Sequence, residues 1–122
     1  MSALEAQFGG DAVRKSVIVT ATEAPVLGPV DVQNYVNLGI YVSNVGGGSA
    51  DSITSVAIET APTPDGPWVV VTDALAGALA NDATAFKLIS ATAMKFVRLQ
   101  AKCGAGDDTT ADFWLCASRY GK

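Results

Sequence analysis

The chain contains no histidine and only two cysteines among its 122 residues. Histidine is the side chain that most often works as a general acid or base near neutral pH, so its absence removes the commonest route to such catalysis. No Gly-x-Ser-x-Gly motif, phosphate-binding loop, dinucleotide-binding glycine pattern or Cys-x-x-Cys motif occurs either. These absences predict a protein that is not an enzyme and that uses no cofactor and no catalytic metal.

Charge is also scarce, because only 16% of the residues are charged and the formal net charge is −4. No stripe of basic residues is present, which argues against binding to DNA or RNA through the phosphate backbone. No apolar run approaches the roughly 20 residues that a membrane-spanning helix needs. The first residues, MSALE, lack the basic and apolar regions of a signal peptide. We therefore expect no membrane partner and folding in a cytoplasm.

The low charge accompanies a positive mean hydropathy of +0.30. Soluble domains usually contain about 25% charged residues. Isolated monomers keep large apolar patches away from water. The composition therefore favours a homo-oligomer, or a component of a larger assembly, in which neighbouring subunits cover part of the surface.

The two cysteines, Cys103 and Cys116, fall in two neighbouring apolar segments, 95–103 and 111–119. If these segments pair as a hairpin, the cysteines lie about four or five residues apart along the ladder. A disulfide requires Cα atoms about 5.5 Å apart, so this register excludes a bridge. We expect two buried free thiols that act as small apolar side chains.

Apolar residues alternate with polar ones in short segments separated by Gly, Pro, Asn and Asp, which is typical of β-strands. The clearest strand is 35–44, where Val36, Leu38, Ile40 and Val42 lie on one face. Residues 1–12 show no period and are expected to form an N-terminal arm, with the β-domain at 13–122. Further strands are expected at 13–22, 52–60, 68–72, 85–90, 95–103 and 111–119.

Two segments are harder to interpret from their pattern. Residues 24–30 contain two prolines and are expected to form a link between strands, whereas residues 73–82 are the one candidate for a short helix. Seven or eight short strands with turn signals every 8–16 residues indicate an all-β fold. We predict a single-domain β-sandwich, similar to a jelly roll, with antiparallel strands and little helix.

The densest polar cluster is residues 107–112, with three aspartates and two threonines. Oxygen ligands of this kind suit calcium, but the spacing does not match an EF-hand loop. The alternative is a solvated hairpin tip in which Asp and Thr side chains bond backbone amides. The second interpretation is favoured, and no metal site is assigned.

Aromatic residues offer the other candidate site. Trp68, Trp114, Tyr35, Tyr41 and Tyr120 could stack on sugars, but they are more often core or subunit contacts, and Trp68 is expected to plug one end of the sandwich. The last strand is apolar on both faces, which predicts a central position or a partner that covers it. Candidate partner contacts are Leu4, Phe8, Trp114 and Tyr120.

The stretch 58–71 consists of a strand, a Pro/Asp-Gly turn, Trp68 and a run of valines, and is followed by Phe96-Val97-Arg98-Leu99. This order resembles discoidin-like jelly rolls and the small β-sandwich proteins of tailed-phage virions. The likeness covers about 45 residues, and no binding residue of either family can be placed on this chain. The compact size and the expected arm are closer to phage capsid decoration (cement) proteins.

The resemblance implies a virion structural protein that binds and stabilises the major capsid lattice, commonly as a trimer. Assembly would take place in the host cytoplasm, with the major capsid protein or other virion subunits as partners. Two alternatives stay open: a carbohydrate-binding β-sandwich module, and another structural component of a phage tail or neck. Sequence does not separate these, because all three use the same sandwich architecture.

Overall fold

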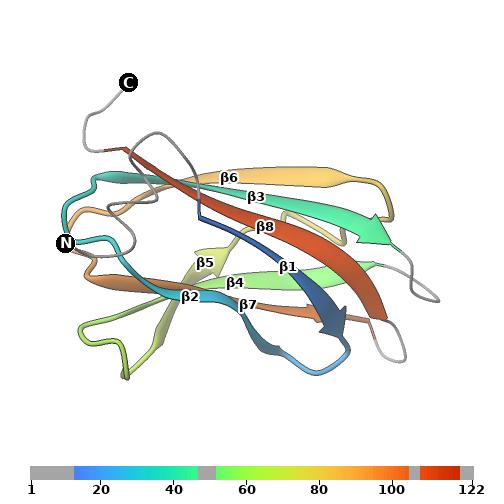
Figure 1. The fold of residues 1–122 in the computed structure, drawn as a ribbon, viewed down its shortest axis with the longest axis horizontal. Coiled ribbons are helices and arrows are strands. Elements are labelled where there is room, and N and C mark those ends of the chain that lie inside the picture. Colours follow the sequence, from blue (N-terminus) through green and yellow to red (C-terminus); the bar gives the residue numbers. More distant parts are fainter. Residues whose placement is uncertain (1–12, 47–51, 105–107, 119–122) are drawn as a thin grey trace.

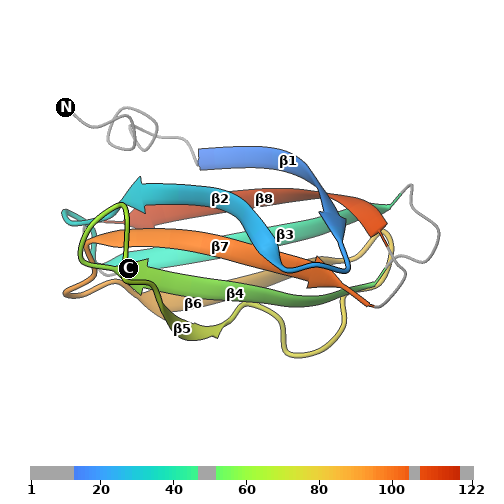
Figure 2. The same ribbon diagram turned by 90° about the horizontal axis from the view of Figure 1, so that it is seen from below.

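The computed structural model describes residues 13–46, 52–104 and 108–118, and these form eight antiparallel strands in two facing sheets (Figures 1 and 2). The strands are β1 (Val13–Thr20), β2 (Ala24–Asp31), β3 (Asn37–Gly46), β4 (Ile53–Ala61), β5 (Val69–Asp73), β6 (Thr84–Ser90), β7 (Phe96–Cys103) and β8 (Asp108–Ser118). The predicted all-β sandwich is confirmed. Within these ranges there is no helix long and apolar enough to cross a membrane.

The strand order is that of a jelly roll. Sheet A has the order β1-β8-β3-β6 and sheet B the order β2-β7-β4-β5. The chain changes sheet at every connection except β4 to β5, so each sheet alternates strands from the two ends of the sequence. Strand β8 is central in sheet A, as its two apolar faces predict.

The core lies between the sheets and is built from alternate residues of the central strands. Leu38, Ile40 and Val42 of β3 are fully buried, as the period-two pattern predicts. Val36, which the same pattern places on this face, is 37% exposed, because it precedes the first residue of β3 and does not share the alternation of the strand. In β4 a register shift between Ile53 and Ser55 brings Ile53 onto the same inner face as Val56 and Ile58. Phe113 and Leu115 of β8 complete this core.

Residues 24–31 form strand β2, so the expected link between strands was wrong. Prolines are tolerated there because β2 is an edge strand, where the missing N–H groups cost no ladder bond. The ladder to β7 shifts register twice, which places both Val26 and Leu27 in the core. At Gly28, φ is +102° and a Cβ atom would lie 2.7 Å from the Val97 carbonyl oxygen, so only glycine fits.

Residues 73–82 contain no helix, which corrects the second expectation. Backbone bonds in this segment go to other strands: Leu79 exchanges N–H···O bonds of 2.8 and 3.0 Å with Ile53, and the Ala74 N–H donates to the Val56 carbonyl. Asp73 accepts bonds from the N–H groups of Val56 and Leu75. Burial of Leu79 against the core outweighs the helix propensity of this Ala-rich stretch, which Gly77 already weakens.

The expected hairpin between the last two segments was also wrong, because β7 belongs to sheet B and β8 to sheet A. Both cysteines are free thiols, as predicted. The reason differs from the predicted one, because the two residues lie in different sheets and do not share a ladder. Cys103 is buried between the sheets and donates to the Val19 carbonyl, whereas Cys116 is half-buried on the outer face of sheet A.

The buried side chain of Asn44 forms hydrogen bonds to two other segments inside the core. Asn44 is fully buried; its Nδ2 donates to the Leu79 carbonyl (2.9 Å) and its Oδ1 accepts from the Thr109 hydroxyl (2.6 Å). Its backbone N–H donates to the Ala83 carbonyl, and its carbonyl accepts from the Asp82 N–H. Asn44 of β3 therefore connects residues 79–83 and strand β8 through hydrogen bonds.

Replacing Thr109 by valine should lower the free energy of unfolding by about 1–3 kcal/mol, because the Asn44 Oδ1 loses its donor inside the core. Urea unfolding measures this. The matched control is Thr54→Val, at an exposed site, which should change the free energy by less than about 0.5 kcal/mol. Equal effects of the two variants would contradict the role assigned to Asn44.

Candidate functional site

Strand register places three aromatic side chains in one row across the outer face of sheet A. Trp114 of β8 is directly opposite Tyr41 of β3, and Tyr41 is directly opposite Phe86 of β6. Directly opposite residues of an antiparallel pair point to the same face. Because Phe113 and Leu115 fill the core, the residue between them, Trp114, faces outward.

Leu88 and Cys116 lie in the neighbouring row of the same face, on either side of Gly39. Together, Tyr41, Phe86, Leu88, Trp114 and Cys116 are called the aromatic face below. Leu88 is 62% exposed, Phe86 53% and Tyr41 41%. The described part of the chain thus leaves contiguous apolar side chains uncovered across β8, β3 and the edge strand β6 of sheet A. Such a patch marks an interaction surface more often than an ordinary solvated one.

Gly39 allows the side chains of the aromatic face to lie close together. A Cβ atom at this position would lie 2.9 Å from the Phe86 ring, so a larger residue would push that ring away. The rings of Phe86 and Tyr41 have centroids 4.7 Å apart at 45° to each other. Burial raises the pKa of the Cys116 thiol, which keeps this side chain neutral and apolar.

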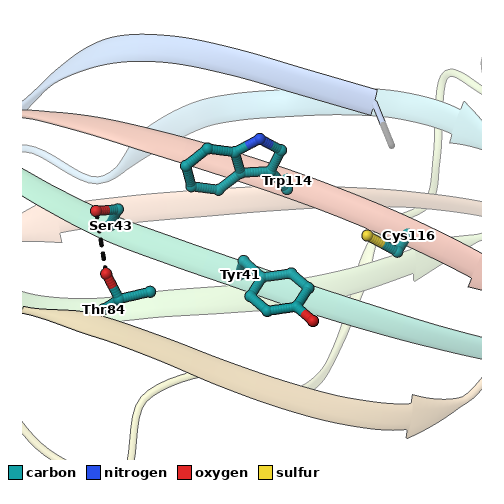
Figure 3. Close-up of a pocket in the computed structure, with 5 residues that line it drawn as sticks. All are labelled: Tyr41, Ser43, Thr84, Trp114 and Cys116. Atoms are coloured by element: carbon teal, nitrogen blue, oxygen red, sulfur yellow. Dashed lines mark hydrogen bonds between the residues drawn. The ribbon is translucent and has the colours of Figure 1, made fainter. Parts of the chain in front are cut away.

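A shallow hollow of about 330 Å³ opens between the first two aromatic residues of the row (Figure 3). Trp114 and Tyr41 line it, the Thr84 hydroxyl donates to the Ser43 hydroxyl (3.2 Å) at one end, and Cys116 lies at the other. The hollow therefore combines flat apolar rings with two hydroxyl groups.

The β1 side of the row ends at a charged group. The Arg14 guanidinium lies 5.5 Å from the Trp114 ring centroid and forms an ion pair with Asp112 (3.1 Å). The Ser16 hydroxyl donates to the same carboxylate. This hydrogen bond holds the pKa of Asp112 below its usual value of 3.8; Arg14 acts in the same direction, while burial opposes it.

Trp68 lies on sheet B, and the prediction that it plugs the end of the sandwich was wrong. It is half-buried, and the Arg98 guanidinium stacks over its ring at 4.4 Å. The Arg98 Nε donates to Glu59 (2.6 Å), which also accepts from Gln100 (2.9 Å). Glu59 and Arg98 are direct cross-strand partners, so this acid serves an ion pair in the sheet and has no catalytic partner there.

Of the predicted contact residues, one lies within the described part of the chain. Trp114 lies in the aromatic face, and Tyr41 joins it there, while Tyr35 is buried in the core. Leu4, Phe8 and Tyr120 lie outside the described residues. Sequence reasoning missed Phe86 and Leu88, although both have the same parity in residues 85–90, opposite to Lys87, which is a pattern that predicts a shared face.

The polar cluster at 107–112 is only partly described, because Asp107 lies outside the described residues. Asp108 pairs with Thr20 across the β1–β8 ladder, and Asp112 lies four residues further along the strand, beside Arg14. Among the described residues, no three Asp, Glu, Cys or His side chains gather in a way that could hold a metal ion.

Comparison with known proteins gives little to add to this geometry. No family model matches the chain, and neither does any curated protein. Among solved structures, the SPBc2 prophage-derived protein YomS is similar, with 14% sequence identity and a TM-score of 0.43 over 84% of this chain and 95% of that one.

Asp112→Asn should remove part of the acid sensitivity of the fold. A carboxylate whose pKa is lowered by folding contributes stability above its unfolded pKa and loses that contribution as the pH falls through the folded value. The melting temperatures of wild type and variant should therefore differ at pH 7 and converge below about pH 4. Asp65→Asn, in an exposed turn, is the control. If the difference in melting temperature between wild type and Asp112→Asn stays constant down to pH 2, the role assigned to Asp112 is contradicted.

Proposed function

We propose that the protein is a non-enzymatic structural protein of a tailed-phage virion, and more specifically a capsid decoration protein that binds the major capsid lattice. The observation that supports this proposal is the aromatic face, which the described residues leave uncovered. The second support is the resemblance of residues 58–99 to small β-sandwich proteins of phage virions. The jelly-roll order fits the proposal without deciding it, since capsid and lectin domains both use it.

Burial of the aromatic face supplies the binding energy in this proposal. Phe86 and Leu88 are more than half exposed, so covering each would contribute about 1 kcal/mol from transfer out of water. Trp and Tyr are the residue types most often found at the centre of protein interfaces, because their rings bury a large area with few rotatable bonds. The hydrogen-bonded strands of sheet A hold these rings in place before binding, which lowers the entropy lost on docking.

The proposal predicts that the protein is present in purified phage particles. It also predicts that Leu88→Lys lowers the number of copies bound to each particle. The new charge would be buried without a partner on docking, whereas Leu88 has no role in the core, so the fold should be retained. Particles that lack the protein are incubated with wild type or variant, and bound copies are counted by quantitative mass spectrometry. We expect at least a tenfold loss of affinity.

Thr54→Lys, at an exposed position of sheet B, provides the matched control and should bind like wild type. Absence of the protein from purified particles would contradict the proposed function. Full occupancy by Leu88→Lys would instead contradict the assignment of the binding surface to the aromatic face.

A second candidate function follows from the hollow itself. Trp114 and Tyr41 present flat rings beside the hydroxyl groups of Ser43 and Thr84, which is a combination suited to stacking and hydrogen bonding of a sugar ring. A carbohydrate-binding module would use the same face as the capsid contact, so the two functions compete for one surface.

Trp68→Phe leaves Trp114 as the one tryptophan in the chain and makes its fluorescence a direct report on the hollow. Under the carbohydrate hypothesis, adding a panel of bacterial surface glycans should shift the Trp114 emission in a saturable way. Tyr41→Ala in the same background should abolish the shift, because it removes one wall of the hollow. Emission that no glycan changes would contradict this second function.

A further inference from the structure

Each sheet of the sandwich has two edge strands, and three of the four carry features that oppose pairing with another chain. These features are Arg14 and Lys15 on β1, Pro25 and Pro29 on β2, and Lys87 on β6. Charged residues and prolines on an edge disfavour the addition of a further strand. Strand β5, at the edge of sheet B, has no proline, and its one charged residue, Asp73, is the last residue of the strand.

Strand β5 instead carries three consecutive valines, Val69, Val70 and Val71, which are 61%, 59% and 41% exposed. The β4–β5 ladder shifts register there: Val70 is opposite Glu59 and Thr72 is opposite Ile58, so Val71 has no direct partner. Val69 and Val70 are in regular register with Thr60 and Glu59, so they point to opposite faces of the sheet and both faces of β5 expose a valine. A strand rich in exposed β-branched residues is well suited to pair with another strand.

From this geometry we infer that β5 is a homodimer contact, in which the β5 strands of two copies pair antiparallel about a two-fold axis near Val70. The two four-stranded B sheets would then join into one sheet of eight strands. Backbone N–H and C=O groups on the open side of β5 would bond to the second copy, and valines would meet valines across the new ladder.

The chemistry of β5 favours a second copy as the occupant. A two-fold contact places the same patch against itself, so the patch must be self-complementary and must not repeat one charge. Residues 69–72 are uncharged and satisfy this condition, whereas self-pairing of β6 about its middle residue would place Lys87 opposite its own copy.

The ends of the strand agree with this arrangement. An antiparallel pair brings Asp73 of one copy toward the start of β5 in the other, where Pro67 and Val69 line a hollow of about 260 Å³ together with Lys95. Asp65 lies in the adjoining turn, so the end of the contact presents charges of both signs and no block of like charge. The inference is independent of the proposed function, because β5 belongs to sheet B and the aromatic face to sheet A.

Light scattering on a gel-filtration column tests the inference with the full chain. Wild type should have twice the monomer mass of 12.5 kDa, and Val70→Lys should be monomeric, with dimerisation weakened at least tenfold. Val45→Lys is the matched control, since Val45 is 50% exposed on β3 of the other sheet, and it should remain dimeric. Circular dichroism establishes that both variants are folded.

Hydrogen exchange of the wild-type protein gives a second measurement that needs no variant. Exchange of the β5 amides should slow as protein concentration rises, while the amides of β2 keep the same rates. A monomer at all concentrations, or a trimer that Val70→Lys leaves unchanged, would overturn the inference. Leu88→Lys should not alter the mass, so failure of this inference and failure of the proposed capsid contact give different results.

Discussion

The antiparallel register of β8 with β3 is the constraint on which both the core and the candidate site depend. Phe113 and Leu115 must face the core because they close the sandwich, and a shift of one residue would exchange them for Trp114 and Cys116. Once the register is set, Trp114 lies opposite Tyr41 on the outer face. The same packing that stabilises the fold therefore exposes the aromatic rings.

The aromatic face and the β5 edge are the two surfaces proposed to bind partners, and they differ in chemistry. The aromatic face is a side-chain surface that extends over β8, β3 and β6 of sheet A, where Phe86 packs close to Gly39 and Tyr41. The β5 edge offers backbone groups and valines at the margin of sheet B. Two separate contacts of this kind would let a small protein bind a lattice and a copy of itself at once, which increases effective concentration at each site.

Much of the fold could be predicted from period-two patterns, because burial of one strand face is a local property of the sequence. The pattern correctly predicts Leu38, Ile40 and Val42 in the core but wrongly adds Val36, which lies before β3 begins. A central position of β8 is one of the two explanations that its apolar faces allow. The errors arise where tertiary contacts decide: β2 is a strand because an edge tolerates prolines, and residues 73–82 are not helical because Ile53 takes the backbone bonds of Leu79. The site was predicted only through Trp114, since the row that joins it to Phe86 depends on strand order, which no local pattern contains.

The proposed capsid contact requires that the aromatic face be covered in the assembled particle. Hydroxyl-radical footprinting with mass spectrometry measures the reactivity of each aromatic side chain in the free protein and in purified virions. Trp114, Tyr41 and Phe86 should lose most of their reactivity in the particle, while Trp68 on the opposite sheet keeps its own. Equal reactivity of the three rings in both states would contradict the proposed contact.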